Sequence, residues 1–159
     1  MLTFSQMAIR FLIAMALGAF IGLEREMIGK EAGIRTSMLV CAGAAIFSVA
    51  GISLPYLIAV SPQNLSDILS HNSGFLTMLA NIVVGIGFLG AGLIIKTEER
   101  VHGITTAATV WVVAAVGILV GIGLIELAVF AAVLVPSVLY LMRTSTLIRD
   151  HRKEEHPSA

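Results

Sequence analysis

Residues Phe75–Ile95 form an unbroken apolar run that limits the possible folds of this chain more than any other feature. The run contains no charged residue, and its only polar side chains are those of Thr77 and Asn81. As an α-helix it would extend roughly 31 Å, which matches the hydrocarbon thickness of a bilayer. We therefore predict a transmembrane helix here.

The second half of this run is rich in glycine, which lets two helix backbones approach closely in lipid. The glycines are Gly85, Gly87, Gly90 and Gly92. At about 100° per residue, Gly85 and Gly92 share one face of the helix with Asn81 and Lys96, and Gly87 shares another with Ala80 and Ala91. We therefore predict that this helix packs on two sides at the centre of a bundle. The spacing also matches the GxGxxG dinucleotide fingerprint, but that motif needs a preceding strand and a solvated turn, so we interpret these glycines as helix-packing residues.

The composition also places the chain in the lipid bilayer. Of its 159 residues, 57% are hydrophobic and 13% are charged, whereas soluble domains carry about 25% charged residues. The net charge is zero, which gives no electrostatic reason to expect nucleic-acid binding. The single cysteine, Cys41, excludes an internal disulfide, and we interpret it as a small buried residue.

We predict an all-α integral membrane bundle of about five transmembrane helices. Their approximate ranges are 4–23, 36–57, 75–95, 104–120 and 124–142, which together make a transmembrane domain over residues 1–142. Pro136 predicts a kink in the fifth helix. Ser61 before Pro62 predicts a short surface helix that continues through about Ser70. Residues 143–159 are predicted to form a charged cytoplasmic tail that begins as a helix.

The basic residues are distributed unevenly between the two ends of the predicted helices. Nine of the ten lysines and arginines lie in loop 24–35, loop 96–103 or the tail. The exception is Arg10, which lies near the outer end of the first helix and can snorkel to the interface. Because basic loops stay in the cytoplasm, we predict that these loops and the C-terminus are cytoplasmic and that the N-terminus is outside.

A short internal similarity links the two halves of the chain. Segments Gly33–Thr36 (GIRT) and Gly103–Thr106 (GITT) each follow a charged loop and open a predicted helix. This similarity predicts two parallel two-helix repeats, related by an axis along the membrane normal, with the fifth helix added.

Four motifs follow one another along the chain. They are Gly18–Glu26 (GAFIGLERE), Ala32–Thr36 (AGIRT), Gly85–Gly92 (GIGFLGAG) and Gly103–Trp111 (GITTAATVW). Their order and spacing resemble the hydrophobic domain of the MgtC/SapB family of bacterial inner-membrane proteins. The resemblance covers about residues 10–125 and does not include the soluble C-terminal domain that many members carry.

The resemblance implies roughly five membrane helices, an inner-membrane location and no known catalytic reaction. Members are linked to growth in low magnesium and to survival inside host cells. We take a regulatory partner of other membrane proteins as the predicted function, and a magnesium or other ion transporter or channel as the alternative. Members often place Arg and Gln at the start of the third helix, where this chain has Thr77 and Asn81.

Charged residues gather at the cytoplasmic end of the first predicted helical hairpin. They are Glu24, Arg25 and Glu26, with Arg35 and Thr36 at the start of the second helix. Ionisable groups at membrane depth are functional candidates, so this cluster is predicted to bind an ion or a partner. The alternative is interfacial anchoring with a structural ion pair. We expect Arg35 to hold a carboxylate through its planar two-pronged donor.

The loop also offers ligands for magnesium, which binds through one or two carboxylates with retained waters. Glu24, Glu26 and Glu31 are the candidate carboxylates. No other cofactor is predicted. The sequence contains no nucleophile–base pair, zinc motif or phosphate loop at a plausible depth, so we predict that the protein is not an enzyme.

Further polar candidates lie on the third and fourth predicted helices. They are Asn81, Lys96, Thr105, Thr106 and Thr109. Asn81 either makes an interhelical hydrogen bond or lines a pathway. The threonine hydroxyls either cap the fourth helix and bond back to its carbonyls, or line a polar cavity together with Asn81 and Lys96.

Small residues suggest close helix contacts at several places in the bundle. The first and fourth predicted helices carry further pairs, Gly18 with Gly22 and Gly117 with Gly121. Together with the third-helix glycines, these are more small faces than a monomer needs. We therefore predict a homo-oligomer in the bilayer, with another membrane protein as a further candidate partner.

Overall fold

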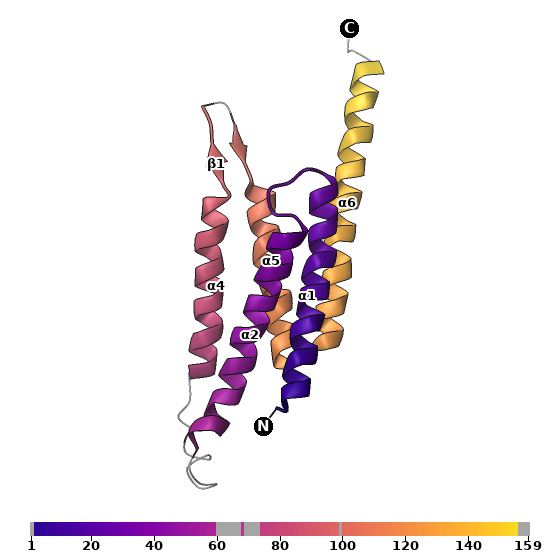
Figure 1. The fold of residues 1–159 in the computed structure, drawn as a ribbon. Helices are drawn as coiled ribbons and strands as arrows, with labels where there is room; N and C mark the ends of the chain where they lie inside the picture. Colours follow the sequence, from indigo (N-terminus) through magenta and orange to yellow (C-terminus); the bar gives the residue numbers. More distant parts are fainter. Residues whose placement is uncertain (1, 60–67, 69–73, 99, 156–159) are drawn as a thin grey trace.

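A computed structural model of the chain describes residues 2–59, 68, 74–98 and 100–155, the last ten of these by backbone alone. Within these residues there are five long helices and one short β-hairpin (Figure 1). In chain order they are α1 (Phe4–Met27), α2 (Ile34–Ile58), α4 (Gly74–Gly92), β1 (Ile95–Lys96), β2 (Val101–His102), α5 (Ile104–Ile122) and α6 (Ile125–Glu155). All five helices are long and apolar enough to cross a membrane, which confirms the predicted all-α membrane bundle.

The helices run alternately in opposite directions, so the two termini lie at opposite ends of the bundle (Figure 1). We call the end that carries the β-hairpin and the α1–α2 loop the charged end. Helices α1, α2 and α5 pack against one another, while α4 lies on α2 and α5, and α6 lies on α1 and α5. The centre of the bundle is therefore the group of α1, α2 and α5.

Helix α2 is held between two pairs of glycines. The pairs are Gly18 with Gly22 on α1 and Gly117 with Gly121 on α5. A Cβ atom added at Gly18 would lie 2.6 Å from the Cβ of Cys41, and one added at Gly121 would lie 2.5 Å from the Cβ of Ser48. Since Cys41 and Ser48 are both on α2, both neighbouring backbones approach it more closely than any side chain would allow.

The space between these helices is filled by small and branched apolar side chains. The buried cluster consists of Ala14, Ile21, Cys41, Ala45, Val113, Val116, Val120, Ala128 and Ala132. Close packing of this kind leaves little room for water. A polar side chain is buried beside this cluster: Ser48 of α2 lies against Gly121 of α5 and donates its hydroxyl to the Ala44 carbonyl at 2.8 Å.

Helix α4 lies at the edge of the bundle, so the prediction that it forms the centre is wrong. Gly90 is its only buried residue, and a Cβ atom added there would lie 3.6 Å from the Cβ of Ala107 on α5. A Cβ atom added at Gly85, Gly87 or Gly92 would meet nothing within 4 Å. The sequence did not reveal this because a lipid tail and a neighbouring helix are equally apolar surroundings.

The predicted loop 96–103 contains a short antiparallel hairpin. Ile95 pairs with His102 and Lys96 pairs with Val101. Helix α4 therefore ends at Gly92, and Lys96 lies beyond the helix face that it was predicted to share with Asn81.

Helix α6 is longer than the predicted fifth span. It continues through Pro136 to Glu155, so the first part of the predicted tail is helical. The surface helix predicted from Ser61 to about Ser70 lies outside the described residues, except for residue 68.

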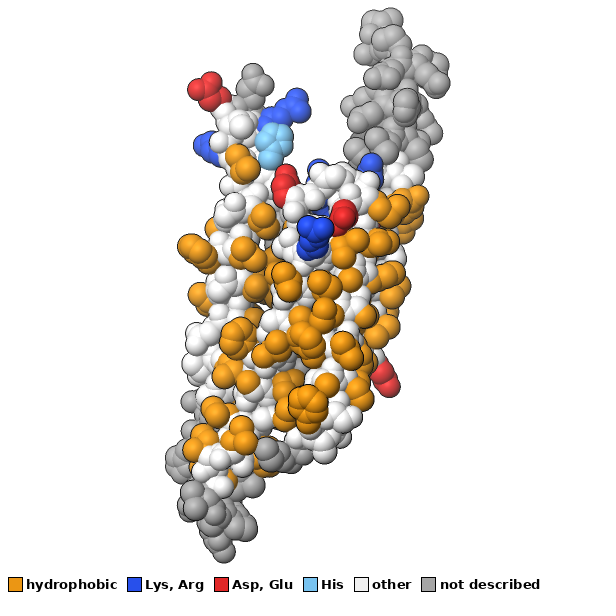
Figure 2. Space-filling view, viewed as in Figure 1, with side chains coloured by type: hydrophobic (Ala, Val, Ile, Leu, Met, Phe, Trp, Pro, Cys, Tyr) orange, Lys and Arg blue, Asp and Glu red, His pale blue; other side chains and the backbone are white. Residues whose placement is uncertain are grey.

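The two predicted helical hairpins pack against each other. Helix α1 packs on α2, α4 packs on α5, and α2 and α5 lie against each other. Figure 2 shows apolar side chains over the middle of one face, with most of the charged side chains near the hairpin. This separation is what a bilayer-spanning bundle requires.

Candidate functional site

The predicted polar cluster is divided between the interior of the charged end and its surface. The buried members are Arg25, Thr106 and Thr109. The partly covered members are Glu24 and Thr36, and the exposed ones are Glu26, Arg35, Lys96, Thr105 and, on α4, Asn81. The candidate site therefore centres on the end of α1 and the start of α5.

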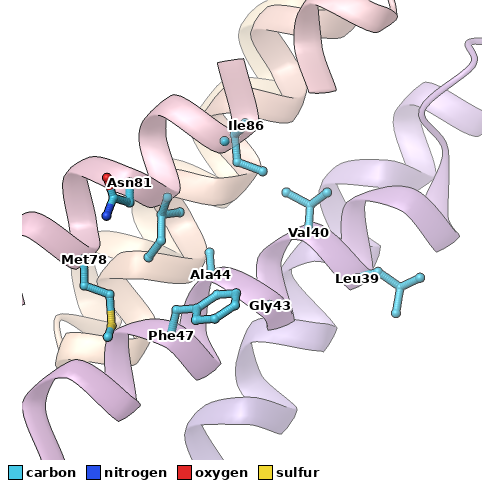
Figure 3. Close-up of a pocket in the computed structure, with 10 residues that line it drawn as sticks. Leu39, Val40, Gly43, Ala44, Phe47, Met78, Asn81 and Ile86 are labelled. Carbon is cyan, nitrogen blue, oxygen red and sulfur yellow. The ribbon is translucent and has the colours of Figure 1, made fainter. Parts of the chain in front are cut away.

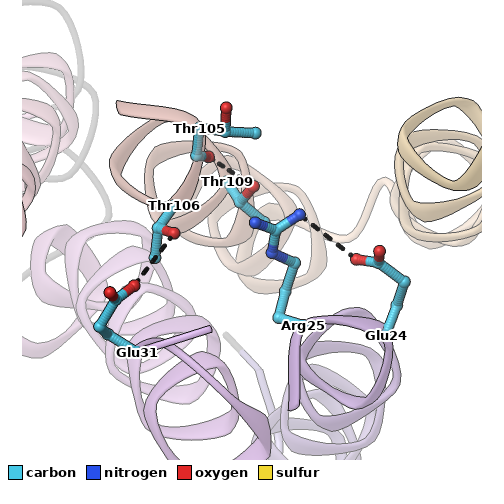
Figure 4. Close-up of polar contacts among 6 residues, drawn as sticks. All are labelled: Glu24, Arg25, Glu31, Thr105, Thr106 and Thr109. Carbon is cyan, nitrogen blue, oxygen red and sulfur yellow. Dashed lines mark hydrogen bonds and ion pairs between the residues drawn. The ribbon is translucent and has the colours of Figure 1, made fainter. Parts of the chain in front are cut away.

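Among the described residues, Arg25 is the charged side chain that is buried in the bundle. It lies on the last turn of α1 and points toward α5 (Figure 4). Its side chain is 4% exposed, and its Nη1 donates to Glu24 Oε2 at 3.5 Å, a long hydrogen bond. Its buried Nε has no hydrogen-bond partner among the described residues. Because a guanidinium has five N–H donors, Arg25 keeps donor capacity that this part of the chain does not use.

Glu26 links the two helices of the first hairpin through the backbone. Its Oε2 accepts a hydrogen bond of 2.8 Å from the Ile34 N–H, at the start of α2. A Cβ atom added at Gly33 would lie 2.6 Å from the same oxygen, so glycine leaves space for this contact. A carboxylate at a helix N-terminus satisfies a free N–H and interacts favourably with the helix dipole. Glu26 therefore caps α2.

Arg35 does not hold a carboxylate, contrary to our expectation. Its side chain is exposed, and Arg25–Glu24 is the one ion pair among the residues that the structure describes. The orientation of α2 explains the difference. Ser37, two residues later, is the buried residue that faces α1, and its carbonyl oxygen would lie 2.6 Å from a Cβ atom added at Gly18.

The threonines at the start of α5 make two different contacts. Thr109 donates its hydroxyl to the Thr105 carbonyl at 2.8 Å, which is the back-bonding pattern expected for a threonine inside a helix. Thr106 instead reaches the α1–α2 loop, where its hydroxyl lies 3.5 Å from Glu31 Oε2 (Figure 4). Thr106 thereby connects the start of α5 to the α1–α2 loop, which Glu26 spans through its hydrogen bond to Ile34.

A cavity of about 770 Å³ opens beside Arg25 at the charged end. Its charged and polar lining comes from Glu24, Arg25, Lys30, His102, the α5 start Gly103–Thr106, and Arg143 of α6. Sequence reasoning missed Lys30, His102 and Arg143 as members of this site. The available signal was the concentration of basic residues in the loops and the tail. That pattern predicted the orientation of the helices in the membrane, but it does not show which side chains come together in a site.

The three carboxylates proposed for magnesium have separate partners. Glu24 faces Arg25, Glu26 caps α2 and Glu31 lies near Thr106. No group of three or more His, Cys, Asp or Glu side chains that could hold a metal ion is found in the described chain. The geometry of these residues gives no support to the magnesium site suggested by the sequence.

Asn81 lies on the exposed side of α4, where it lines a groove between α4 and α2. The groove has a volume of about 480 Å³ and an otherwise apolar lining that includes Val40, Ala44 and Phe47 of α2 and Ile86 of α4. Figure 3 shows Asn81 on α4 opposite the α2 side chains. The groove is separate from the charged-end cavity, so the predicted cavity formed jointly by Asn81, Lys96 and the threonines is not present here.

Arg10 makes a structural contact that sequence reasoning did not find. Its Nη1 donates a 2.7 Å hydrogen bond to the Gly121 carbonyl, at the last turn of α5. The guanidinium also lies close to Gly123, whose φ of +98° favours glycine. A cation at a helix C-terminus is stabilised by the free carbonyls there. Arg10 thereby ties α1 to the α5–α6 turn, at the end opposite Arg25.

These features define an integral membrane protein of the helical-bundle class, with a charged cavity at one end and an open apolar groove on one side. A family model described as the MgtC family matches residues 11–147. The chain belongs to the MgtC family.

Named relatives support the same assignment. The chain is 38% identical over 138 residues to "Putative magnesium transporter YhiD" of Escherichia coli (strain K12), covering 85% of this chain and 59% of the relative. It is 43% identical over 130 residues to "Protein MgtC" of Brucella abortus (strain 2308), covering 82% and 48%. It is 38% identical over 135 residues to "Protein MgtC" of Salmonella typhimurium (strain LT2), covering 85% and 52%. The chain thus spans about half the length of these curated relatives, and no solved structure matches it.

Proposed function

We propose that this protein is a regulatory interaction protein of the bacterial inner membrane, linked to magnesium limitation, which acts through helix–helix contacts and without catalysis. Membership of the MgtC family supports the membrane assignment. The name of the E. coli relative, which provisionally describes it as a magnesium transporter, supports a link to magnesium.

The observation that carries this proposal is the contrast between a closed interior and an open side. The middle of the α1, α2 and α5 group is filled by apolar side chains such as Ala45, Val113 and Val116. A path for a hydrated cation needs polar groups along its length. These side chains offer none, and the neighbouring buried hydroxyl of Ser48 is bonded to the Ala44 carbonyl of its own helix. The polar Asn81 instead lines the outer groove between α2 and α4. An accessible apolar groove of this kind suits a protein that binds other helices.

The occupant that we propose for this groove is helix α4 of a second copy of the chain. Gly85 lies one helical turn after Asn81, and neither Gly85 on α4 nor Gly43 on the α2 wall has an atom within 4 Å of an added Cβ. Small residues allow close approach of a second helix. Two copies of Asn81 can also hydrogen-bond to each other within lipid, where an unpaired amide is unfavourable.

Disulfide cross-linking tests this contact directly. Asn81→Cys is introduced into the full chain, and membranes are treated with a mild oxidant. The natural chain is a matched control because Cys41, its only cysteine, is buried. Leu12→Cys on the exposed side of α1 is a second control, since Leu12 is 61% exposed. We expect covalent dimers from Asn81→Cys and from neither control. Gly85→Cys is a second variant at the same contact, and failure of both variants to cross-link would reject the dimer.

Transport is the alternative function, and its test uses the purified protein by itself. The full chain is reconstituted into liposomes loaded with a magnesium-sensitive dye, and magnesium is added outside. We expect influx no faster than in protein-free liposomes. Influx that rises with the amount of protein would replace the regulatory proposal with a transporter.

The proposed orientation places the charged end and the C-terminus in the cytoplasm and the N-terminus outside. Its support is the nine-to-one distribution of basic residues, together with the place of Arg10 near the α5–α6 turn. A reporter fused after Ala159 should be active only if it is a cytoplasmic reporter. Activity of a periplasmic reporter at this position would reverse the assignment.

A further inference from the structure

The charged-end cavity is lined by more positive than negative charge. Arg25, Lys30 and Arg143 contribute three cationic side chains, and Glu24 is the carboxylate in the lining. Lys30 and Arg143 are exposed and can move toward a ligand, whereas Arg25 is fixed in the wall. The electrostatic field in such a recess favours an anion.

The start of α5 adds backbone donors to the same cavity. The residue before the helix, Gly103, has a φ of +86°, and no side chain caps the helix there. The first N–H groups of a helix have no partner within the helix, and they carry the positive end of its dipole. The lining includes Gly103, Ile104, Thr105 and Thr106. An anion in the cavity would therefore face backbone N–H groups as well as cationic side chains.

Arg25 supplies an independent reason to expect a ligand. It is 3% exposed, it lines the cavity, and its Nε is buried without a hydrogen-bond partner among the described residues. Its contact with Glu24 is 3.5 Å long. A buried guanidinium with unused donors is unfavourable unless a further acceptor is present. An oxyanion that bridges Arg25 and the start of α5 would supply that acceptor.

From this geometry we infer that the cavity binds a phosphate group, carried either by an anionic phospholipid or by a soluble phosphate compound. A phosphate offers several strong acceptor oxygens, which suit a fork of guanidinium donors combined with helix N–H groups. The other lining residues include the apolar Ile28, Ile104 and Leu139, and these suit the glycerol and acyl portion of a lipid equally well. The site does not depend on the proposed dimer, because the groove on α4 is separate from it.

Thermal unfolding of the purified full chain in a neutral detergent tests the site. One arm adds inorganic phosphate against sodium chloride at equal ionic strength, and the other adds phosphatidylglycerol against phosphatidylcholine. A ligand that binds only the folded protein raises its Tm in a concentration-dependent way. A response to phosphatidylglycerol alone identifies a lipid headgroup, and a response to both, with competition between them, identifies a phosphate site open to solvent.

Two double variants that remove the same number of charges distinguish binding in the cavity from nonspecific electrostatic attraction to the charged end. The double variant Lys30→Gln with Arg143→Gln removes two cations from the cavity, and we expect its apparent affinity to fall by about tenfold or more. The control is Arg35→Gln with Lys96→Gln, which removes two exposed cations of the same end that do not line the cavity. Its affinity should stay within about twofold of the natural chain, since exposed charges are screened.

Arg25→Gln should abolish the response, and if it does not fold, the double variant still decides the question. The site is overturned if neither probe raises the Tm of the natural chain. It is also overturned if the control and the cavity variant lose affinity equally.

Discussion

Helices α1 and α4 each begin one of the two predicted helical hairpins, yet their glycines meet different surroundings. Gly18 and Gly22 of α1 lie so close to α2 that an added Cβ would come within 2.6 to 2.7 Å of its atoms or of Gly33. Gly85 and Gly87 of α4 meet nothing. A small-residue face therefore identifies a helix surface that a second helix can approach closely. Which helix packs there, if any, is decided by the arrangement of the whole bundle.

The sharpest test of this comparison is one added methyl group on each helix. Gly18→Ala places a Cβ against Cys41 and the Ser37 carbonyl, so we expect it to lower the free energy of unfolding by about 2–3 kcal/mol. Gly87→Ala, which does not line the groove, is the matched control and should be neutral or stabilise by up to about 1 kcal/mol, because alanine favours the helix. Unfolding by a denaturing detergent, followed by circular dichroism, measures both. Equal losses would mean that α4 is as closely packed as α1.

The next largest effect should come from the contact at the far end of α1. Arg10→Met keeps the apolar stem but removes the hydrogen bond to the Gly121 carbonyl, and we expect a loss of about 1.5 kcal/mol. The same unfolding assay applies. Arg35→Met serves as the control, since Arg35 is exposed at the other end. A silent Arg10→Met would show that α1 is positioned by its glycines alone.

Loss of the Glu26 cap should have a smaller effect, of about 1 kcal/mol. Glu26→Ala removes the acceptor for the Ile34 N–H, whereas Glu26→Gln retains an oxygen there and should lose less. Amide hydrogen exchange at Ile34 provides a local measurement, with faster exchange expected in Glu26→Ala. Unchanged protection would indicate that another acceptor takes over.

The smallest effect is expected for Arg35→Lys, within about 0.5 kcal/mol of the natural chain. Arg35 is exposed and makes no ion pair among the described residues, so either cation can occupy its place. A normal amount of inserted protein with normal unfolding would agree with this reading. A large loss of stability would restore the predicted pairing of Arg35 with a carboxylate.

Much of the fold could be predicted from the sequence, because membrane spans depend on the length and apolarity of segments such as Phe75–Ile95. The central helix could not be predicted on the same basis, since apolarity does not distinguish lipid from a neighbouring helix. A usable signal was present in α2, where Cys41, Ala45 and Ser48 fall on one small-residue face. That face was overlooked in favour of the glycines of α4.

The candidate site could be predicted in part. Its residues at the ends of α1 and α5 were found because they are polar and adjoin apolar runs. Arg25 and Arg35 could not be told apart, because the rotation of each helix decides which arginine enters the bundle. The partner of Arg10 is a backbone carbonyl, which has no signature in the amino-acid sequence.

The position of α2 between two glycine pairs also has a consequence for synthesis of the chain. Gly18 is already in the chain when Cys41 emerges from the ribosome, but Gly117 follows about 75 residues later, which takes roughly 4–15 s at 5–20 residues per second. During that interval one face of α2 has no intramolecular neighbour. A chaperone or a helix from another nascent chain could bind it in that time, so the order of translation, as well as the final packing, influences how reliably this protein assembles.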